Sequence, residues 1–471
     1  MSENDEQYRV EADSLGEVEV PADAYWGAQT QRAVQNFPIS GETFGRRFVR
    51  ALGVVKKSAA RANADLGLLE ADVAEAIVEA ADEVIEGEHD DQFPVDVFQT
   101  GSGTSTNMNA NEVIANRAAE ITGAAVGERA VHPNDHVNYG QSSNDVIPTA
   151  MHVAALEALA NDVRPALGTL RDALAEQAEA FDGVVKTGRT HLQDATPVRL
   201  GQEFGGYRTQ VEKGITRVES AEVHLRELAL GGTAVGTGLN THPEFPERAA
   251  EYIAEETGLP FREADDHFEA QAAHDAMGEA HGALRTVAGS LHKIANDLRL
   301  LASGPRNGLG ELDQPENQPG SSIMPGKVNP VVAEAVNQVY VQVVGNDAAV
   351  AEGAAGGQLD LNLYKPVLAF NFLQSADLLA NGSEAFAEKF VAKLEADREH
   401  CETQVEQSMA LATALNPSIG YDRASEVAKE ALKTDRTVRE VVVEKGYLTA
   451  EEADEVLDPA RMTERGILGD D

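Results

Sequence analysis

The segment 320–330 holds the residues best suited to chemistry on an anion. It reads Gly-Ser-Ser-Ile-Met-Pro-Gly-Lys-Val-Asn-Pro, with two hydroxyls, one ammonium group and one amide. Its glycines leave backbone N–H groups open to a ligand, and the helical pattern from Val331 places the positive end of a helix dipole after it. A surface Pro–Gly turn is the ordinary explanation for such a loop. Here the density of polar groups, stiffened by Pro325 and Pro330, favours a carboxylate site that binds more tightly as the carboxylate gains charge.

Three further polar segments stand in front of predicted helices, and they are Gln99–Asn111, Gln141–Asp145 and Lys186–Pro197. The helices expected after them cover about 112–122, 148–181 and 198–230. These segments carry more Ser, Thr and Asn than helix capping needs. A lone histidine is more often structural, but the place of His191 within the third segment favours a functional role. Either several helix N-termini converge on one anion or the four segments are unrelated capped loops; the sequence alone does not bring them together.

Two other motifs are not expected to bind metal or dinucleotide. His132 and His136 stand four residues apart, which on a helix would suit a metal, but Pro133 and its Asx neighbours disfavour a helix. We therefore expect a short polar loop able to bind a second carboxylate, and no zinc site. Gly231–Thr241 contains no G-x-G-x-x-G and follows no clear strand, so we expect a flexible loop that packs near the polar segments.

The charge balance excludes several classes of partner. Among 471 residues, 79 are acidic and 38 are basic, which gives a net charge of −41. Such a field disfavours nucleic acid and anionic membranes as partners. It also repels an anionic substrate, so the site must be locally positive and is best suited to high ionic strength, where salt screens the field. We expect a salt-adapted cytosol.

The cysteine count and the apolar runs indicate a cytoplasmic protein. Cys401 is the only cysteine, so neither an intrachain disulfide nor a cysteine-ligated iron–sulfur cluster can form within one chain. The acidic residues 1–7 do not resemble a secretory signal, and no apolar run approaches the length of a membrane span. We therefore expect a soluble protein in a reducing cytoplasm.

Apolar periodicity predicts three regions. Short strands are expected at Tyr8–Ala12 and Val18–Val20, and helical spacing runs from Phe44 to about Glu88. Five long helical stretches between Pro148 and Glu399 predict one elongated bundle, and a shorter segment with small helices follows. We assign an N-terminal domain to residues 1–141, a helical-bundle domain to residues 142–403 and a small C-terminal helical domain to residues 404–471.

Residues 320–330 resemble the signature loop of the fumarase/aspartase superfamily, and Gly326 followed by Lys-Val-Asn-Pro resembles its class II fumarase variant. The resemblance extends from Tyr25-Trp-Gly to Leu457–Met462 and includes all four polar segments. It implies a mainly α, three-domain fold whose central five-helix bundle forms a twenty-helix core in a homotetramer. It also implies that each active site takes loops from three subunits and uses no metal or organic cofactor.

The reaction implied by this resemblance is the reversible, stereospecific hydration of fumarate to (S)-malate in the tricarboxylic acid cycle, through a carbanion (aci-carboxylate) intermediate. By resemblance, Ser321 is the base that takes the carbon proton, held as an alkoxide by Lys327 and loop N–H groups. His191 handles the water and is oriented by Glu334. The implied substrate-binding residues are Ser102, Gly103, Thr104, Ser142, Ser143, Asn144, Thr190, Ser322, Lys327, Val328 and Asn329. A second dicarboxylate site is carried over onto Arg129, His132, Pro133, Asn134 and Asp135.

Two alternatives remain open from the sequence. An aspartase would release ammonia from aspartate by the same carbanion chemistry, but Gly326 and Ala28–Gln31 resemble fumarases instead. A non-catalytic relative, of the kind that serves as a lens protein, belongs to another functional class. The presence of Ser321, Lys327 and His191 argues against it.

Overall fold

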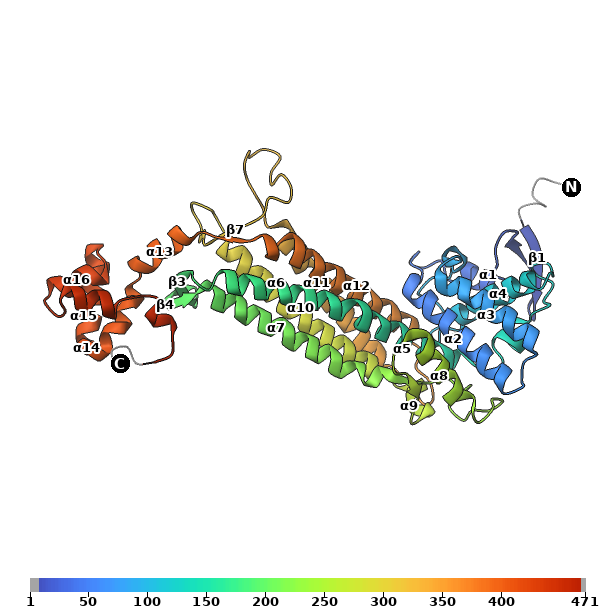
Figure 1. Cartoon of the computed structure of the whole chain (residues 1–471). Coiled ribbons are helices and arrows are strands. Elements are labelled where there is room, and N and C mark those ends of the chain that lie inside the picture. Colours follow the sequence, from blue (N-terminus) through green and yellow to red (C-terminus); the bar gives the residue numbers. More distant parts are fainter. Residues whose placement is uncertain (1–7, 467–471) are drawn as a thin grey trace. The chain divides into compact units, whose positions relative to one another are not determined.

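Helices dominate the computed structural model, which describes residues 8–466 (Figure 1). Within this range the strands form only two-stranded pairs, so the mainly α fold expected from the sequence is confirmed. Residues 1–7, whose acidic character argued against a secretory signal, lie outside the described range. The chain divides into two compact units. The first unit comprises Met1–Pro165, Thr216–Thr286 and Val341–Ala380, and the second comprises Ala166–Ile215, Val287–Tyr340 and Asn381–Asp471.

The first unit is a cluster of helices with two short strand pairs. Its elements are β1 (Tyr8–Asp13), β2 (Gly16–Pro21), α1 (Ala28–Asn36), α2 (Arg46–Asp65), α3 (Ala71–Glu86), α4 (Thr104–Ile121), α5 (Ser143–Ala158), β5 (Glu227–Leu228), α8 (Phe245–Thr257), β6 (Arg262–Glu263) and α9 (His267–Ala272). Strands β1 and β2 are antiparallel and lie where the sequence predicts strands, and β5 pairs with β6 in parallel. Helix α2 packs against α3, α5 and α8 through a buried face that includes Leu52, Val55 and Ala59.

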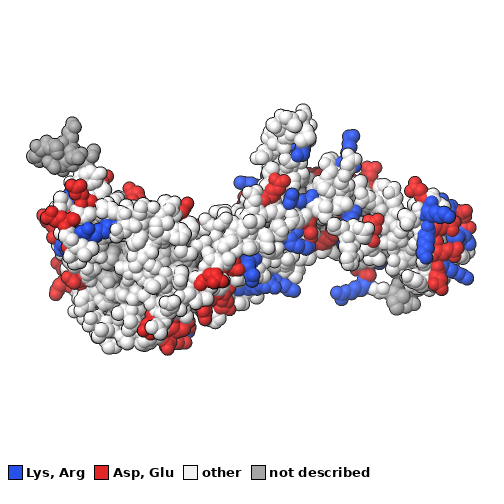
Figure 2. Space-filling view, turned by 180° about the vertical axis from the view of Figure 1, so that it is seen from behind, with Lys and Arg blue, Asp and Glu red and all other residues white. Residues whose placement is uncertain are grey.

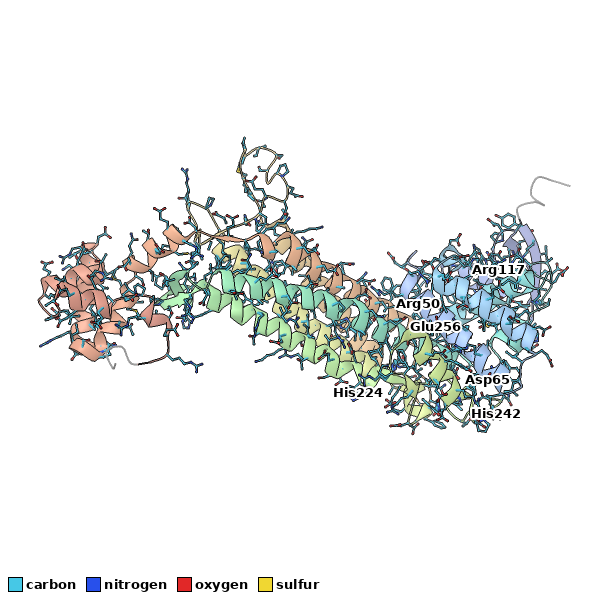
Figure 3. The ribbon with its side chains drawn as sticks, in the orientation of Figure 1. Arg50, Asp65, Arg117, His224, His242 and Glu256 are labelled. Carbon is cyan, nitrogen blue, oxygen red and sulfur yellow. The ribbon has the colours of Figure 1, made fainter. Side chains whose placement is uncertain are left out.

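Ion pairs join α2 to α8 at the surface of the first unit, where Figure 3 labels Glu256. Lys57 Nζ lies 2.7 Å from Glu256 Oε2, and Arg61 Nη2 lies 3.1 Å from Glu255 Oε2. Surface pairs of this kind each contribute about 0–1 kcal/mol. The buried apolar contact therefore accounts for most of the attraction between these helices.

Helix α1 was not predicted, and the reason lies in how its start is capped. The backbone N–H groups of Gly27, Gln29 and Thr30 donate to the buried carboxylate of Glu112 at 2.9, 2.9 and 3.0 Å. These donors would otherwise be left without partners at the helix N-terminus. Because the cap comes from a distant part of the chain, no local signal marks the start of this helix.

Helices α4 and α5 begin earlier than predicted. Helix α4 starts at Thr104 instead of near residue 112, directly after Gly103 in the left-handed conformation. Helix α5 starts at Ser143 instead of Pro148, because Ser142 caps it within a capping box. Polar residues assigned to loops by their composition thus form the first turns of both helices. Pro148 lies inside α5 instead of opening it.

The long helices continue from one unit into the other along the chain. They are α6 (Arg164–Ala180), α7 (Leu200–Glu222), α10 (Asp275–Leu301), α11 (Val331–Ala355) and α12 (Lys365–Lys389). Within the first unit, His281 of α10 lies 2.9 Å from both Asp347 of α11 and Ser375 of α12. Within the second unit, Tyr207 of α7 donates to Asp297 of α10 at 3.0 Å. Each unit therefore contains packed segments of the long helices that the sequence predicts.

The second unit adds a hairpin and a group of short C-terminal helices. Its remaining elements are β3 (Val185–Thr190), β4 (Gln193–Arg199), β7 (Leu312–Asp313), β8 (Glu395–Ala396), α13 (Arg398–Gln407), α14 (Asn416–Ile419), α15 (Tyr421–Thr434), α16 (Val438–Glu444) and α17 (Ala450–Val456). Strands β3 and β4 are antiparallel, where the sequence analysis predicted a loop. The short helices share a buried core that includes Leu415, Val427 and Val441. Between residues 8 and 466, no helix combines the length and the apolarity that a membrane span requires.

Candidate functional site

Hydroxyl groups at the starts of α4 and α5 form a chain in the first unit. Ser102 Oγ lies 2.7 Å from Thr104 Oγ1, which lies 2.6 Å from Ser143 Oγ. Two polar segments that the sequence alone does not bring together are therefore in contact. Both lie at helix N-termini, where backbone N–H groups and the helix dipole favour an anion. This arrangement is suited to binding a carboxylate.

A glycine and a capping serine set the shape of this surface. Gly103 has φ 79°, and a Cβ there would lie 2.9 Å from a neighbouring side chain, so the position requires glycine. Ser142 Oγ accepts a hydrogen bond from the Asn144 N–H at 3.2 Å, and Asn144 Nδ2 donates to the Ala234 carbonyl at 2.7 Å. The glycine-rich segment 231–241 therefore packs against the polar segment Gln141–Asp145, as predicted.

In the second unit, the segment 320–330 folds back on itself before α11. Asn329 Nδ2 donates to the Gly320 carbonyl at 2.6 Å. A Cβ at Gly320 would lie 1.9 Å from the Lys327 carbonyl oxygen, so this close approach requires glycine. Gly326 has φ 78°, and the Lys327 N–H donates to the Met324 carbonyl at 3.3 Å across the Pro–Gly turn.

Backbone donors surround the hydroxyl of Ser321. Its Oγ accepts hydrogen bonds from the N–H groups of Ile323 at 3.2 Å and Met324 at 3.0 Å. Serine turns with no chemical role contain the same pattern. Two donors on Oγ nevertheless stabilise an alkoxide more than they stabilise the neutral alcohol, because hydrogen bonds to a charged form are stronger. Ser322 and Lys327 nearby have exposed side chains and are open to a ligand.

A cavity of about 370 Å³ in the second unit is lined by Val328, Glu334, Arg299 and Gln314 among others. Arg299 Nε and Gln314 Oε1 are buried and have no hydrogen-bond partner among the described residues. The lining of the cavity thus includes one cation, Arg299, and one carboxylate, Glu334. Sequence reasoning missed Arg299 because it lies inside the helical pattern of α10, where nothing distinguishes it from a surface arginine.

His191 lies at the tip of the β3–β4 hairpin, which corrects its assignment to a loop that ends at a helix. His191 and Leu192 have φ values of 55° and 59°, and both side chains are exposed, as is Thr190. Within the described range, no hydrogen bond or ion pair joins His191 to Ser321 or Glu334. Figure 1 shows the hairpin and the loop before α11 as separate parts of the second unit. One copy of this unit therefore does not bring these predicted catalytic residues into contact.

A buried ionic cluster fixes the base of this hairpin. Lys186 is 1% exposed and Glu311 is 0% exposed. Lys186 Nζ lies 3.1 Å from Glu311 Oε2 and 3.2 Å from Glu203 Oε2, and Arg189 Nη1 lies 2.5 Å from Glu311 Oε1. Buried charges are stable only when they are paired in this way. The hairpin that carries His191 therefore cannot shift without separating charges in the interior.

The segment after residue 131 forms a helical turn where a loop was predicted. Pro133–Val137 is a π-helical turn, and Pro133 stands at its first position, where a missing N–H is harmless. His132 Nδ1 accepts from the N–H groups of Asn134 at 3.2 Å and Asp135 at 3.1 Å. The His132 N–H in turn donates to His136 Nδ1 at 2.9 Å. Both imidazoles thus cap backbone groups.

The residues predicted for a second dicarboxylate site are only partly brought together. Asn134 and Asp135 line a cavity of about 810 Å³ whose lining includes His242, labelled in Figure 3. The exposed Arg129 donates instead to the Ala12 carbonyl. No hydrogen bond or ion pair among residues 8–466 links Arg129 to the turn that begins at residue 133.

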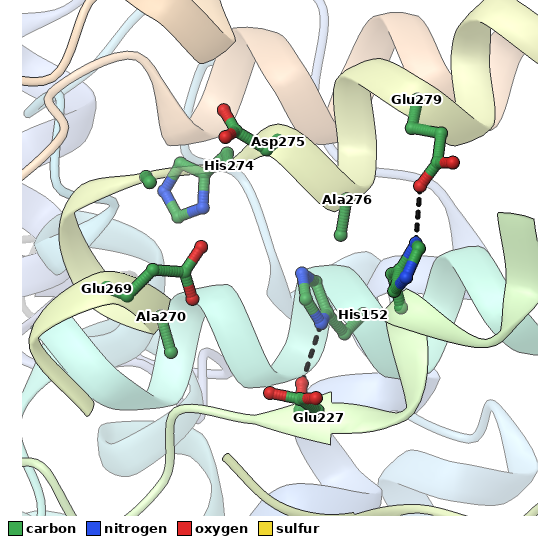
Figure 4. A pocket seen from close by; sticks show the side chains of 10 residues that line it. His152, Glu227, Glu269, Ala270, His274, Asp275, Ala276 and Glu279 are labelled. Carbon is green, nitrogen blue, oxygen red and sulfur yellow. Dashed lines mark hydrogen bonds and ion pairs between the residues drawn. The ribbon is translucent and has the colours of Figure 1, made fainter. Parts of the chain in front are cut away.

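A third cavity, of about 460 Å³, lies in the first unit (Figure 4), and its lining includes His152, Glu227, Glu269, His274, Asp275 and Glu279. Burial lowers the pKa values of His152 and His274, so both imidazoles are neutral at pH 7. Burial and the nearby Asp275 and Glu227 raise the pKa of Glu269. No Lys or Arg lines this cavity, so it is unsuited to a dicarboxylate. In the described part of the chain, no cluster of three or more His, Cys, Asp or Glu residues is arranged to hold a metal ion.

Comparisons with known proteins agree along almost the whole chain. The family model described as lyase matches residues 16–345, and the model of the fumarase C C-terminus matches residues 411–464. A class II fumarate hydratase of Halobacterium salinarum is 80% identical over 467 residues, covering 99% of each chain. That of Nitrosomonas europaea is 57% identical, over 98% of this chain and 100% of its own. Among solved structures, a class II fumarase of Schistosoma mansoni superposes with a TM-score of 0.94 at 41% identity, over 97% of this chain and 99% of its own.

The substitution Glu311→Gln tests whether the ionic cluster holds the hairpin. It leaves Arg189 and Lys186 without their shared carboxylate, and removing one partner of a buried pair costs about 3–5 kcal/mol. We expect a lower midpoint in denaturant unfolding and faster amide hydrogen exchange in residues 185–199. Glu395→Gln, at an exposed position of β8, is the matched control and should change neither. Wild-type exchange rates in Glu311→Gln would contradict the proposed anchoring.

Proposed function

The chain belongs to the class II fumarase family, and from this premise we propose how its residues carry out the reversible hydration of fumarate to (S)-malate. The observation that carries the assignment is the 80% identity to a fumarate hydratase over the full length. The relatives at 53–57% identity are also fumarate hydratases, so the aspartase alternative is not favoured.

The difficulty of the reaction is electrostatic. In dehydration, a base removes the proton from the carbon beside one carboxylate, and that carboxylate becomes a dianionic aci-carboxylate. The adjacent carbon then loses hydroxide, which leaves as water once it is protonated. Preorganised donors that face the new charge lower the barrier, because they need no reorganisation when the charge forms. The residues of the site are therefore assigned by where that charge develops.

Ser321 is proposed as the base for the carbon proton. The two N–H groups that donate to its Oγ support this role, because they favour the alkoxide. Lys327, on the same turn, is proposed to supply the positive charge that a serine alkoxide requires. With Ser322, Val328 and Asn329 it also binds the carboxylate that gains charge.

His191 and Glu334 are proposed to act on the water. The imidazole takes a proton from water in hydration and returns it in dehydration, and the carboxylate orients the imidazole. Because these two residues are not in contact within one copy of the chain, this proposal requires His191 from a different subunit. Thr190 beside His191 is proposed to bind the substrate.

The starts of α4 and α5 are proposed to bind the other carboxylate, whose charge does not change. The residues involved are Ser102, Gly103, Thr104, Ser142, Ser143 and Asn144. The hydroxyl chain from Ser102 to Ser143 supports this proposal. Each hydrogen bond to a charged group contributes about 1.5–3 kcal/mol.

A homotetramer with a twenty-helix core is proposed to assemble each site from three subunits. An exposed apolar stripe on α11 supports this, since Val341 is 67% exposed and Val344 39% exposed, with Gly345 and Ala348 following at helical spacing. Figure 2 shows a broad area of the first unit without charged side chains, although the net charge is −41. We also propose that the chain forms three domains, with boundaries at residues 141/142 and 403/404.

We propose that the protein is cytoplasmic and that it is active at high salt concentration. Burial raises the pKa of the Cys401 thiol to about 12, so this cysteine stays protonated and unreactive. Salt screens the repulsion between an acidic surface and a dicarboxylate.

The turn from His132 to Asp135, with Pro133, Asn134 and the exposed Arg129 side chain, is proposed as a second dicarboxylate site outside the catalytic one.

The reaction itself is tested by supplying the pure protein with malate and then with aspartate in high salt. Fumarate is followed by its ultraviolet absorbance. We expect fumarate from malate alone. Fumarate from aspartate would favour the aspartase reaction, and fumarate from neither would favour a non-catalytic protein.

Ser321→Ala tests the assignment of the base. Losing the alkoxide should lower kcat by about 10³-fold or more while the oligomer, measured by light scattering, stays intact. Ser220→Ala, an exposed serine on α7, is the control and should retain wild-type turnover. Turnover near the wild-type rate in Ser321→Ala would remove Ser321 from this role.

A further inference from the structure

Lys365 connects two segments of the first unit that carry hydrogen-bond donors, Ser102–Thr104 and Ser142–Asn144, which are called the first and second donor segments below. It is 0% exposed, at the start of α12. Its backbone N–H donates to the Gly101 carbonyl at 3.2 Å, directly before the first segment. Its Nζ donates to the Asn144 carbonyl at 3.0 Å, inside the second segment. One residue thus bonds to the backbone of both.

Pro148 explains why the side chain of Lys365 is needed. In a regular helix, the carbonyl of Asn144 would accept from the N–H of residue 148. Proline has no N–H, so its place inside α5 leaves that carbonyl without its helical donor. Lys365 Nζ supplies the missing donor. A buried carbonyl without a partner would otherwise weaken the first turn of α5, where Ser142 and Ser143 lie.

One buried carboxylate stabilises the charged form of Lys365. Buried Asp145 attracts the ammonium and itself accepts from the N–H groups of Ser142 at 2.9 Å, Gly231 at 3.0 Å and Thr233 at 2.9 Å. Burial lowers the pKa of Lys365 from 10.5 to about 7, and Asp145 opposes this shift.

Two further titratable groups face this interior from other elements. His274, before α10, is buried and neutral because burial and the nearby Lys365 lower its pKa. Lys56 of α2 donates to Asn138 at 2.9 Å and to Gln141 at 3.0 Å. The interior next to the donor segments thus contains two lysines, one aspartate and one neutral histidine.

Close packing makes the position of Lys365 rigid. A Cβ on Gly101 would lie 2.0 Å from the carbonyl oxygen of Leu363, so the backbone two residues before α12 lies directly against Gly101. A displacement of α12 by even a few tenths of an ångström would therefore move Gly101 and its neighbour Ser102. The hydrogen bond from Lys365 Nζ to the Asn144 carbonyl fixes the position of the second donor segment in the same way.

We propose that Lys365 is a positioning residue for the reaction: it holds the Ser102–Thr104 and Ser142–Asn144 segments in the register in which their donors bind one carboxylate. This rests on the proposed function, which assigns to these segments the carboxylate whose charge does not change. An interaction made equally in the ground state and the transition state affects KM and leaves kcat almost unchanged. A loss of folded protein has the opposite signature, since it lowers the apparent kcat at constant KM.

Lys365→Met is the first test, with KM and kcat for malate and the dissociation constant of succinate as readouts. We expect KM and the succinate constant to rise about tenfold or more, with kcat within about threefold of wild type. Lys389→Met, an exposed lysine on the same helix, is the matched control and should leave all three unchanged. If Lys365→Met fails to assemble, Lys365→Gln, which keeps a donor of shorter reach, replaces it with the same expected rise.

The double variant Lys365→Met/Pro148→Ala tests the mechanism. Alanine at position 148 returns a backbone N–H to the Asn144 carbonyl, so we expect KM to recover at least half of its rise on a logarithmic scale. An unchanged KM in the single variant, or no recovery in the double variant, would overturn the proposal. In both cases the wild-type protein still turns over malate. A wild-type protein that is inactive on malate would instead contradict the proposed function.

Discussion

A carboxylate that takes up a second negative charge is the species that this fold has to stabilise. Charge of that kind is tolerated away from bulk water only where donors are already in place. In the proposed mechanism the 320–330 turn that leads into α11 supplies the donors for this carboxylate, and the hydroxyls before and within the first turns of α4 and α5 bind the other one. Helix N-termini add the positive ends of their dipoles. Helices α4, α5 and α11 therefore contribute donors at their N-termini in addition to packing in the core.

Each unit holds a cluster of buried ionisable groups close to its predicted site residues. In the first unit, Asp145, Lys56 and Lys365 are buried near the starts of α4 and α5, and their charges influence one another's pKa values. In the second unit, Glu311 binds Lys186 and Arg189 at the base of the His191 hairpin. Buried pairs add little net stability, but they are costly to separate and so fix geometry. Internal charges that fix geometry suit a protein with a net charge of −41, because its exposed charges repel an anionic substrate.

Periodicity predicted most of the fold, and its failures have local causes. The long helices were found because their apolar stripes continue over many turns. Helix α1 was missed because Glu112 caps it from far along the chain. The starts of α4 and α5 were set too late, since hydroxyl and amide residues are read as loop until cap geometry is known. The β3–β4 hairpin was missed because strong turn residues outweighed short strands.

The sequence named candidate site residues but not the residues that support them. The motif around Ser321 and the polar segments could be named from the sequence. Arg299 and Lys365 could not, because each lies in an ordinary helical pattern: only the fold places Arg299 in a cavity wall and brings Lys365 to the Asn144 carbonyl. The link between Pro148 and Lys365 is of this kind: a missing N–H in one helix is compensated by a side chain from another. The same holds for residues of separate subunits, whose contacts no single chain reveals.

Subunit complementation tests most directly whether separate chains share one site. Ser321→Ala and His191→Ala chains, each inactive alone, are unfolded together, mixed in equal amounts and reassembled. If different chains supply Ser321 and His191, about a quarter of the sites in random hybrids receive both native residues, and that share of wild-type malate turnover should return. If one chain supplies both residues, no hybrid site is complete, and a mixture that stays inactive after reassembly would contradict the shared site.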